Sequence, residues 1–295
     1  MLKPVHVFTT PEVWNRHGYL LRLPDPEVHY VHSMDLAHLE SRFGDLQAEV
    51  VYGMGGGQAV DTAKWVGGRA GARVVAVPTV LSTDAALVPS VAVRVEGRVR
   101  YVGDRAPDEL VILEEAILAA PPRYNAAGWG DVLSIYTAVW DWRLGSTRTG
   151  EPFDREVAEE ALALLEEACL PDTRGGLRTL LAALKAEVRL CQQVGSSRPE
   201  EGSEHLFAYV LEPRLPADRK YLHGELVGLG LSVMSRIQGQ DQEHITSLMD
   251  RAGLRWRPEE LGIPKALIRQ VLQAMPAEAE IYKFPYCIAH EMQVR

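Results

Sequence analysis

The chain has 295 residues, of which 46% are hydrophobic, so it can bury a substantial core and is long enough for two domains. Its formal net charge is −9, and acidic residues outnumber basic ones both in residues 1–120 (15 against 11) and in the remainder (25 against 20). Neither part is basic and no window is apolar over the length of a bilayer, which argues against a nucleic-acid partner and against a membrane span.

The first part of the chain alternates short apolar runs with segments of helical spacing. No signal-peptide segment precedes the first run, so we expect a cytoplasmic protein. Runs rich in β-branched residues favour strands at residues 4–8, 28–31, 49–52 and 73–77. Helical spacing lies between them at residues 34–46 and 59–67. This alternation predicts βαβ units and a parallel sheet of the kind that binds dinucleotides.

A glycine-rich turn follows the third of these strands. It contains the triplet Gly55-Gly56-Gly57 and then Gln58, and a helical segment starts directly after it. Residues without a Cβ allow a sharp turn and let a phosphate approach the amide N–H groups at a helix start. We therefore predict that these four residues bind the pyrophosphate of a dinucleotide. The alternative is a tight strand-to-helix turn with no ligand.

The fourth strand ends in polar residues. Val77 and Pro78 are followed within a few positions by Thr79, Ser82 and Asp84. Ligands of open parallel sheets bind at the carboxyl ends of the strands. Thr79 and Ser82 are therefore candidate cofactor contacts, and Asp84 is a candidate contact to a substrate. An N-capping turn with no ligand is the alternative.

Adjacent prolines at positions 121 and 122 end the α/β pattern. Before them, residues 90–95 and 99–102 flank a glycine-containing connection and predict a hairpin. Because two prolines stop a helix, we place a domain boundary here, with an α/β domain at residues 1–120 and a helical domain at residues 121–295.

Spacing of apolar residues by three and four predicts several helices in the second domain. The first runs over residues 154–168, with Asp154 as its cap and Pro171 as its stop. The others are predicted at residues 177–194, 204–211, 224–238, 242–252 and 265–274.

The cysteines do not form a recognisable pattern. Cys169, Cys191 and Cys287 are odd in number, far apart and without a Cys-x-x-Cys pair. This argues against a disulfide framework and against a thiolate metal site. We expect buried, unreactive thiols.

Three short signatures in the helical part contain candidate metal ligands. They are Asp131 in the run GWGD, His205 in GSEH and His223 in HGE. One oxygen and two imidazole ligands leave a coordination position open, as catalytic zinc and iron sites require. Taken singly, an aspartate such as Asp131 is more often a helix cap or a solvated carboxylate. Each of the two histidines, taken singly, is more often a hydrogen-bonded structural residue. A metal with an open position and a dinucleotide turn together indicate hydride transfer.

These motifs resemble the iron-containing (group III) alcohol dehydrogenase superfamily, which includes glycerol dehydrogenases, sn-glycerol-1-phosphate dehydrogenases and, more distantly, 3-dehydroquinate synthases. The resemblance covers roughly residues 49–235. Residues 53–64 are similar to the cofactor turn of the superfamily, and residues 77–85 to a strand-end motif of glycerol dehydrogenases. Three segments look more like glycerol-1-phosphate dehydrogenases, at residues 128–142, 202–211 and 223–230.

The resemblance implies a dehydroquinate synthase-like fold, with a shortened, Rossmann-like α/β N-terminal domain and an all-α, metal-binding C-terminal domain. Cofactor and metal would lie in the cleft between them. Asp131, His205 and His223 would ligate one divalent metal, for which zinc is the first choice and iron or nickel the alternatives. Asp131 and His223 would be catalytic through that metal, and Asp84 would be a carboxylate near the reacting alcohol. NAD or NADP would carry the hydride, and the protein would be a homo-oligomer.

Some residues depart from the superfamily pattern. The glycine turn starts near residue 55, several tens of residues earlier than usual, so we expect one strand–helix element to be missing. No acidic residue is present at positions 31–34, where a carboxylate would hold the adenine ribose, so both NAD and NADP are considered. Ile135 and Tyr209 stand where glycerol-1-phosphate dehydrogenases usually have a lysine and a histidine.

We therefore expect a metal-dependent NAD(P) oxidoreductase that interconverts a small polyol or polyol phosphate, similar to glycerol 1-phosphate, and its ketone. Its partner would be that small molecule. Aspartate rather than glutamate at position 131 favours the dehydrogenases over the synthases. Two alternatives are a sugar-phosphate cyclase-like biosynthetic enzyme of the same superfamily and a catalytically lapsed homologue that binds metal or nucleotide.

Overall fold

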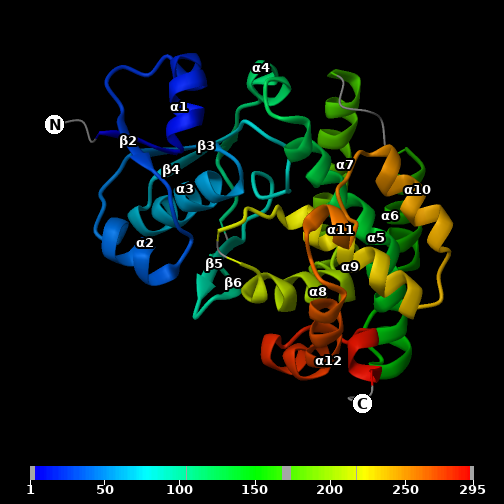
Figure 1. Ribbon diagram of the computed structural model, residues 1–295. Coiled ribbons are helices and arrows are strands. Elements are labelled where there is room, and N and C mark those ends of the chain that lie inside the picture. Colours follow the sequence, from blue (N-terminus) through cyan, green and yellow to red (C-terminus); the bar gives the residue numbers. More distant parts are fainter. Residues whose placement is uncertain (1–3, 104, 168–173, 217, 293–295) are drawn as a thin grey trace. The chain divides into compact units, whose positions relative to one another are not determined.

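The computed structural model describes residues 4–103, 105–167, 174–216 and 218–292 (Figure 1). The chain divides into two compact units, Met1–Pro121 and Pro122–Arg295, which we call unit 1 and unit 2. Each unit has its own hydrophobic core. Within the described ranges, no helix combines the length and the apolar character needed to cross a membrane.

Unit 1 contains a five-stranded parallel sheet with the strand order β2-β1-β3-β4-β7. All four strands predicted from β-branched runs are confirmed, within a few residues at their ends. The fifth, β7, is a two-residue edge strand that the sequence pattern did not indicate. The strands are β1 Val5–Thr9, β2 Glu27–Tyr30, β3 Val50–Gly55, β4 Arg73–Pro78 and β7 Glu109–Leu110.

The chain adds strands to the sheet on both sides of β1. The chain leaves β1 through α1 (Pro11–His17) and η1 (Gly18–Leu21) toward β2, and it leaves β3 through α3 (Gly57–Ala70) toward β4 on the other side. The helix α2 (Leu36–Phe43) returns the chain from β2 to β3. The strand order therefore reverses between β1 and β3, and open α/β sheets bind ligands at the carboxyl ends of strands at such a point.

The two faces of the sheet carry different clusters of buried side chains. Phe8, Leu39 and Val51 belong to the larger cluster, which includes residues of α2 and α3. Val7 and Met54, which point to the opposite face because side chains alternate along a strand, belong to the other cluster.

The predicted hairpin is confirmed as β5 (Val91–Val95) and β6 (Arg98–Val102). The short helix α4 (Glu114–Leu118) follows β7.

All regular secondary structure in the described part of unit 2 is helical. It opens with the long helix α5 (Pro122–Thr149), whose start at Pro122 fits the preference of proline for the first turn of a helix. The helices α8, α9 and α12 share one hydrophobic core. The other elements of unit 2 are α6 Arg155–Glu167, α7 Arg174–Val194, α8 Ser203–Leu211, η2 Glu212–Arg214, α9 His223–Ile237, α10 Gln242–Arg251, α11 Pro258–Leu261, α12 Lys265–Tyr282 and η3 Ile288–Glu291.

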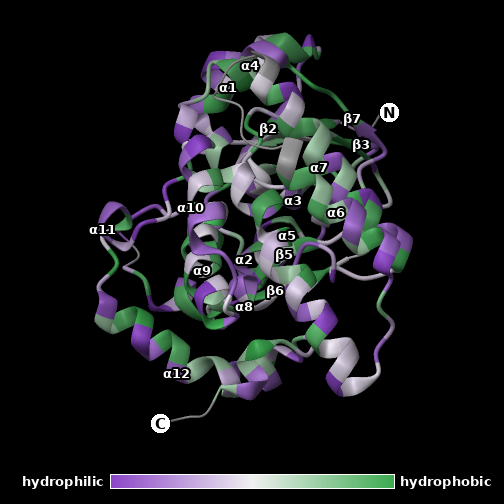
Figure 2. Ribbon diagram, turned by 90° about the vertical axis from the view of Figure 1, so that its right-hand side faces the viewer, coloured by the Kyte–Doolittle hydropathy of each residue, from purple (hydrophilic) through white to green (hydrophobic). Residues whose placement is uncertain are grey.

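Two sequence-based boundaries in unit 2 can be compared with the structure. Asp154 caps α6, since its Oδ1 accepts from the N–H of Val157 at 3.1 Å, whereas the predicted stop at Pro171 lies outside the described residues. The prediction that the last helix ends at residue 274 was wrong. The helix α12 continues through Pro276 because its apolar stripe, visible as alternating hydrophobic and hydrophilic residues in Figure 2, buries Met275 and Ala279 in the core.

The cysteines only partly match the expectation of burial. Cys287 is buried, and burial raises the pKa of its thiol well above the usual range. Cys191 is partly exposed, so the prediction was wrong for this residue. Cys169 lies outside the described residues.

Candidate metal centre and dinucleotide turn

Asp131, His205 and His223 lie together in unit 2, although they are far apart in the sequence. Asp131 is on α5, His205 is on α8, and His223 is the first residue of α9. One oxygen of the carboxylate and one ring nitrogen of each histidine lie within 4.8 Å of one another. The structure thus brings all three candidate metal ligands into one cluster.

The cluster is buried on one side and accessible on the other. Asp131 and His205 are 7% and 6% exposed, whereas the side chain of His223 is 27% exposed. Its Nε2 lies 4.0 Å from the Oδ1 of Asp131. A molecule arriving from solvent would therefore reach the cluster on the side of His223.

The ring of His205 is held by the neighbouring Glu204. His205 Nδ1 and Glu204 Oε1 are 2.9 Å apart, and the glutamate is fully buried. The carboxylate also accepts from the N–H of Gly202 at 2.7 Å and from the hydroxyl of Thr137 at 2.6 Å. A carboxylate at Nδ1 keeps a proton on that nitrogen and leaves the Nε2 lone pair for a metal. This is the usual support of a histidine ligand.

Negative charge dominates around His205. Burial lowers the pKa of His205, but the hydrogen bond and charge of Glu204, with the charges of Glu201 and Asp131, outweigh burial and raise the pKa to about 9. The same surroundings favour a divalent cation. Because a protonated imidazole has no lone pair for a metal, binding of the cation releases a proton.

The position of His223 is fixed through Glu225, which is also buried. Arg123, near the start of α5, donates to both carboxylate oxygens of Glu225, at 2.6 and 2.7 Å. Glu225 also accepts from the N–H of Leu222 at 3.2 Å and so caps the start of α9. The ring of His223 stacks on Tyr209, with centroids 6.0 Å apart and an interplanar angle of 16°. Both the backbone and the ring of this histidine are thereby positioned.

Glycines allow the three helices to approach closely at the cluster. A Cβ on Gly130 of α5 would overlap the carbonyl oxygen of Gly224 on α9. A Cβ on Gly230 of α9 would lie 2.6 Å from the carbonyl oxygen of Glu204 on α8. Real Cβ atoms do not tolerate such contacts with backbone, so only glycine fits these positions. These glycines thus allow α5, α8 and α9, which carry the candidate ligands, to pack closely.

The donor set fits one divalent transition metal. Two imidazole nitrogens and one carboxylate oxygen are ligands that zinc, iron and nickel accept, and three protein ligands leave room for water or substrate. The oriented His205 and the excess of negative charge support the same fit. The cluster can therefore hold a metal and expose it to an oxygen of a small molecule.

In unit 1, the glycine turn lies at the carboxyl end of β3. Gly55 has a φ of 153°, which favours glycine, and α3 begins two residues later at Gly57. No side chain caps this helix at Gly56, and a Cβ on Gly57 would lie only 3.3 Å from the Oγ1 of Thr83. The helix start, with Gln58 as its second residue, presents N–H groups and the positive end of the helix dipole to an anion.

Asp61 and Lys64, which follow the turn in sequence, are both buried on α3. Lys64 Nζ lies 2.8 Å from the Oδ1 of Asp61. Burial raises the pKa of Asp61, while the charge of Lys64 opposes this shift. Lys64 Nζ also donates to the carbonyl oxygens of Ala85 at 2.7 Å, Val88 at 3.1 Å and Ser90 at 2.6 Å. The lysine therefore anchors the segment that follows β4 to α3.

The polar residues predicted at the end of β4 are close to the glycine turn. The N–H of Thr79, a buried residue, donates to the carbonyl oxygen of Gly55 at 3.0 Å, so the ends of β3 and β4 meet. Ser82 and Asp84 follow in the loop and are partly buried. Thr79 and Ser82 thus lie in the same unit as the turn. Asp84 also belongs to unit 1, whereas the three candidate ligands belong to unit 2.

The end of β1 also lies at this edge of the sheet, although it was not among the predicted site residues. Thr9 ends this strand, and the side chain of Thr10 caps α1 by accepting from the N–H of Val13 at 3.4 Å. Because the strand order reverses between β1 and β3, this end lies at the same switch point as the glycine turn. The sequence shows this end as a strand followed by Thr-Thr-Pro. This pattern predicts a helix start, because threonine is a common N-cap and proline a common first helical residue.

Comparison with known proteins identifies the family. Residues 12–121 match the family model described as iron-containing alcohol dehydrogenase. A glycerol-1-phosphate dehydrogenase [NAD(P)+] of Aeropyrum pernix is 38% identical over an alignment of 263 positions that covers 86% of this chain and 71% of that protein. The chain belongs to this family of glycerol-1-phosphate dehydrogenases within the iron-containing alcohol dehydrogenases. The enzyme of the same name from Hyperthermus butylicus is 32% identical over 91% of this chain and 80% of its own length.

Solved structures share the fold. The crystal structure of glycerol dehydrogenase from Schizosaccharomyces pombe matches with a TM-score of 0.68 and 19% identity, over 95% of this chain and 85% of that one. This likeness confirms the fold class inferred from the sequence, an α/β Rossmann-like domain with a helical domain.

Ile135 and Tyr209 both lie in unit 2. Ile135 is fully buried on α5, one helical turn after Asp131. Tyr209 is buried on α8, its ring lies against that of His223, and its hydroxyl donates to Glu201. The aromatic side chain therefore occupies one face of a candidate ligand.

Proposed function

We propose that this chain is a metal-dependent NAD(P) oxidoreductase that interconverts glycerol 1-phosphate, or a closely similar polyol phosphate, and its ketone. The observation that carries this proposal is the convergence of Asp131, His205 and His223 on one cluster. The relatives' names, glycerol-1-phosphate dehydrogenase [NAD(P)+], suggest the substrate and the cofactor class. In this proposal unit 1 binds the dinucleotide and unit 2 binds the metal.

When bound, the metal acts as a Lewis acid that acidifies the alcohol, and the nicotinamide accepts the hydride. The residues of the chain bind and orient these groups. Asp131, His205 and His223 hold the ion, and Glu204 keeps the Nε2 of His205 available by retaining a proton on Nδ1. We assign release of the alcohol proton to Asp84 or to a neighbouring water molecule.

The dinucleotide is assigned to the switch point of the sheet in unit 1. Backbone N–H groups of Gly55, Gly56, Gly57 and Gln58 would bind its pyrophosphate at the start of α3. Thr79 and Ser82 would contact the nicotinamide part from the neighbouring strand end. NAD and NADP are both candidates, and zinc is the metal we propose first.

A pocket in unit 2 is a candidate place for the phosphate of a phosphorylated substrate. It has a volume of about 390 Å³, and its lining combines the basic Arg123, Arg219, Lys220 and Arg255 with the acidic Glu259 and Glu260. Arg123 and Arg255 lie within ion-pair distance of Glu225, which leaves Arg219 and Lys220 as the candidate phosphate contacts. Lys220 precedes His223 by three residues, so their Cα atoms are at most about 11 Å apart. A lysine at this distance from the cluster suits a phosphate group better than the free hydroxyl of glycerol. We assign the phosphate of the substrate to this cavity.

The test is a dehydrogenase assay with metal-loaded full-length protein. Dihydroxyacetone phosphate and dihydroxyacetone are offered with NADH and NADPH, and glycerol 1-phosphate, glycerol 3-phosphate and glycerol with the oxidised forms. We expect turnover of the phosphorylated pair and its loss after chelation. Asp131→Ala and His223→Ala should lose the metal of this cluster and the activity together, whereas His38→Ala, at an exposed position of α2, should retain both.

Each alternative predicts a different result. A cyclase-like enzyme would consume a sugar phosphate without net change in reduced nicotinamide. A lapsed homologue would bind metal or nucleotide but turn over none of these substrates. Loss of activity toward the phosphorylated ketone in Lys220→Met, with unchanged activity toward dihydroxyacetone, would support the phosphate assignment, whereas equal effects on both substrates would contradict it.

A further inference from the structure

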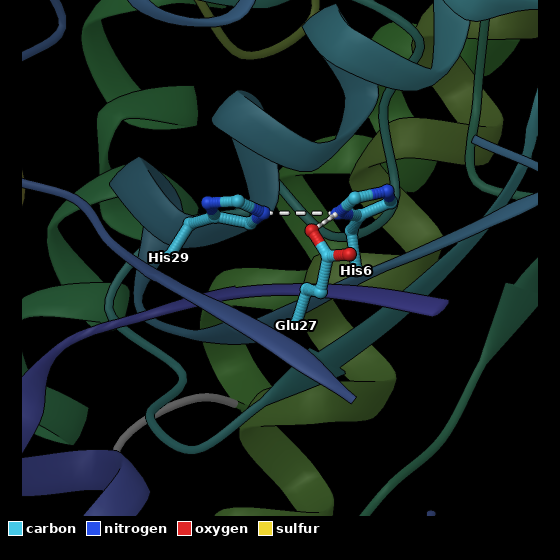
Figure 3. A group of neighbouring side chains, drawn as sticks. All are labelled: His6, Glu27 and His29. Atoms are coloured by element: carbon cyan, nitrogen blue, oxygen red, sulfur yellow. Dashed lines mark hydrogen bonds and ion pairs between the residues drawn. The ribbon is translucent and has the colours of Figure 1, made fainter. Parts of the chain in front are cut away.

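A second group of metal-binding side chains lies in unit 1, on the strands β1 and β2. These strands pair in parallel, with His6 opposite Glu27 and Phe8 opposite His29. Because side chains alternate along a strand, Glu27 and His29 project from the same face of β2. Figure 3 shows that both point toward His6. The group therefore results from strand register rather than from proximity in the sequence.

The ligand atoms of these three residues converge. His6 Nδ1 lies 2.9 Å from His29 Nε2 and 3.5 Å from Glu27 Oε2, and the three atoms are within 4.8 Å of one another. Ligands at about 2.1 Å from a tetrahedral zinc ion lie about 3.4 Å from each other. Small rotations of the side chains would thus admit an ion.

Packing holds the two imidazole rings in place. His6 is 3% exposed, and its ring stacks on that of His29, with centroids 5.1 Å apart. His29 also stacks on Phe8 at 5.0 Å and meets the edge of Phe43 at 5.6 Å. Among the described residues, His6 Nε2 has no hydrogen-bond partner, so the polar contacts of this ring are made through Nδ1 toward the group. The rings are therefore fixed with two nitrogens facing each other.

The exposure of Glu27 and the donor atoms of the three side chains both suit a bound cation. The side chain of Glu27 is 57% exposed, so its carboxylate can adjust and solvent can supply a fourth ligand. Two histidines and one carboxylate form a set that binds zinc, copper, nickel and iron in proteins. We propose that His6, Glu27 and His29 bind a divalent transition metal, with zinc as its first candidate, at a site distinct from the cluster in unit 2.

The position of the group indicates a structural role. His6 and Glu27 lie at the amino ends of their strands, whereas the glycine turn lies at the carboxyl end of β3 in the same parallel sheet. The strand β2 is an edge strand of only four residues, paired with β1. An ion held by both strands would link this edge to the rest of the sheet. Binding would therefore stabilise unit 1 without contacting the dinucleotide turn.

Metal stoichiometry of the full-length protein tests the proposal. After equilibration with low-micromolar free Zn²⁺, we expect two zinc ions per chain in the wild type. Asp131→Ala should keep one ion, and His29→Phe, which preserves ring stacking but removes the ligand, should keep the other. The double variant should hold none. Glu27→Ala changes an exposed side chain and should abolish binding at the second site at this zinc concentration without affecting folding.

The controls separate this site from the proposed function. His32→Ala removes an exposed histidine two residues beyond β2 and should leave both ions bound. Co²⁺ in place of zinc should give a visible absorption band from unit 1 in Asp131→Ala, and Glu27→Ala should abolish it in that background. Unchanged stoichiometry in Glu27→Ala and His29→Phe would overturn the proposal, whatever the outcome of the dehydrogenase assay.

Discussion

At the scale of single residues, the carboxylate of Glu204 is expected to determine how strongly His205 binds a metal. Replacing Glu204 by glutamine keeps an acceptor at Nδ1 but removes the negative charge that raises the pKa of His205 to about 9. We expect about 10- to 100-fold weaker zinc binding, measured by competition with a chelator. An NMR titration of metal-free protein should show a lower pKa of His205.

The matched control is the same substitution at Glu243, an exposed residue of α10. This variant should bind zinc as the wild type does. Equal affinities of the Glu204→Gln and Glu243→Gln variants would show that the buried carboxylate does not support the proposed ligand.

At the scale of secondary-structure elements, the contact between α5 and α9 depends on two glycines. A Cβ on Gly130 would overlap the backbone of Gly224, and backbone atoms cannot rotate away. We expect Gly130→Ala to lower the free energy of unfolding by roughly 1–3 kcal/mol and to weaken zinc binding, because the helices that carry Asp131 and His223 must separate. Denaturant unfolding and zinc titration measure the two effects.

Gly68 provides the control for this prediction. It lies on α3, and a Cβ added there meets nothing within 4 Å. Gly68→Ala should therefore be neutral or stabilise the protein by about 0.5–1 kcal/mol, as is usual for alanine within a helix. A similar small effect at Gly130 would rule out a tight helix contact.

A second element-scale prediction concerns Asp141, which joins α5 to two other elements. Its carboxylate accepts from the N–H groups of Ser203, at the start of α8, and Ile288, at the start of η3, each at 2.7 Å. Burial, together with the charge of Glu204, raises the pKa of Asp141 to about 7, above the value of about 4 for an unfolded chain. Between these values the folded state binds more protons than the unfolded state.

The stabilisation from protonated Asp141 is therefore complete below about pH 4 and is lost as the pH rises toward 7. Relative to Asp141→Asn, metal-free wild-type protein should lose stability by roughly 1.4 kcal/mol per pH unit in this range. Denaturant unfolding at several pH values measures the difference. Asp241→Asn, at an exposed N-cap, gives the baseline for losing a capping carboxylate. A wild-type minus Asp141→Asn difference that is constant with pH would contradict the prediction.

Local patterns predicted most elements because β-branched runs and helical spacing act within a few residues. They were less informative about α5, because the glycines of GWGD resemble a turn although they allow helix packing within a 28-residue helix. The candidate ligands of unit 2 were identified because each is part of a short signature. The group of His6, Glu27 and His29 has no such signature, since it depends on the parallel register of β1 with β2. The burial of Lys64 could not be predicted for the same reason, because its ammonium group donates to backbone carbonyl oxygens of a loop that is distant in the sequence.

At the scale of the whole molecule, each ligand is expected to stabilise the unit to which it is assigned. A ligand at about 100 times its dissociation constant adds about 2.7 kcal/mol to the stability of the part that it binds. Hydrogen exchange should therefore slow under NADH in the glycine turn and α3, and under Zn²⁺ in α5, α8 and α9. Zinc protection of β1 and β2 should appear as well and should be lost in Glu27→Ala.

The variants make this prediction specific. Asp131→Ala should abolish zinc protection of α5, α8 and α9 and leave NADH protection of residues 55–70 unchanged, because the two sets of contacts belong to different units. Exchange measured by mass spectrometry on the full-length chain resolves both regions at once. NADH protection that appears in α8 and α9 but not at the glycine turn would refute the assignment of the dinucleotide to unit 1, while zinc protection that survives Asp131→Ala would refute the ligand set in unit 2.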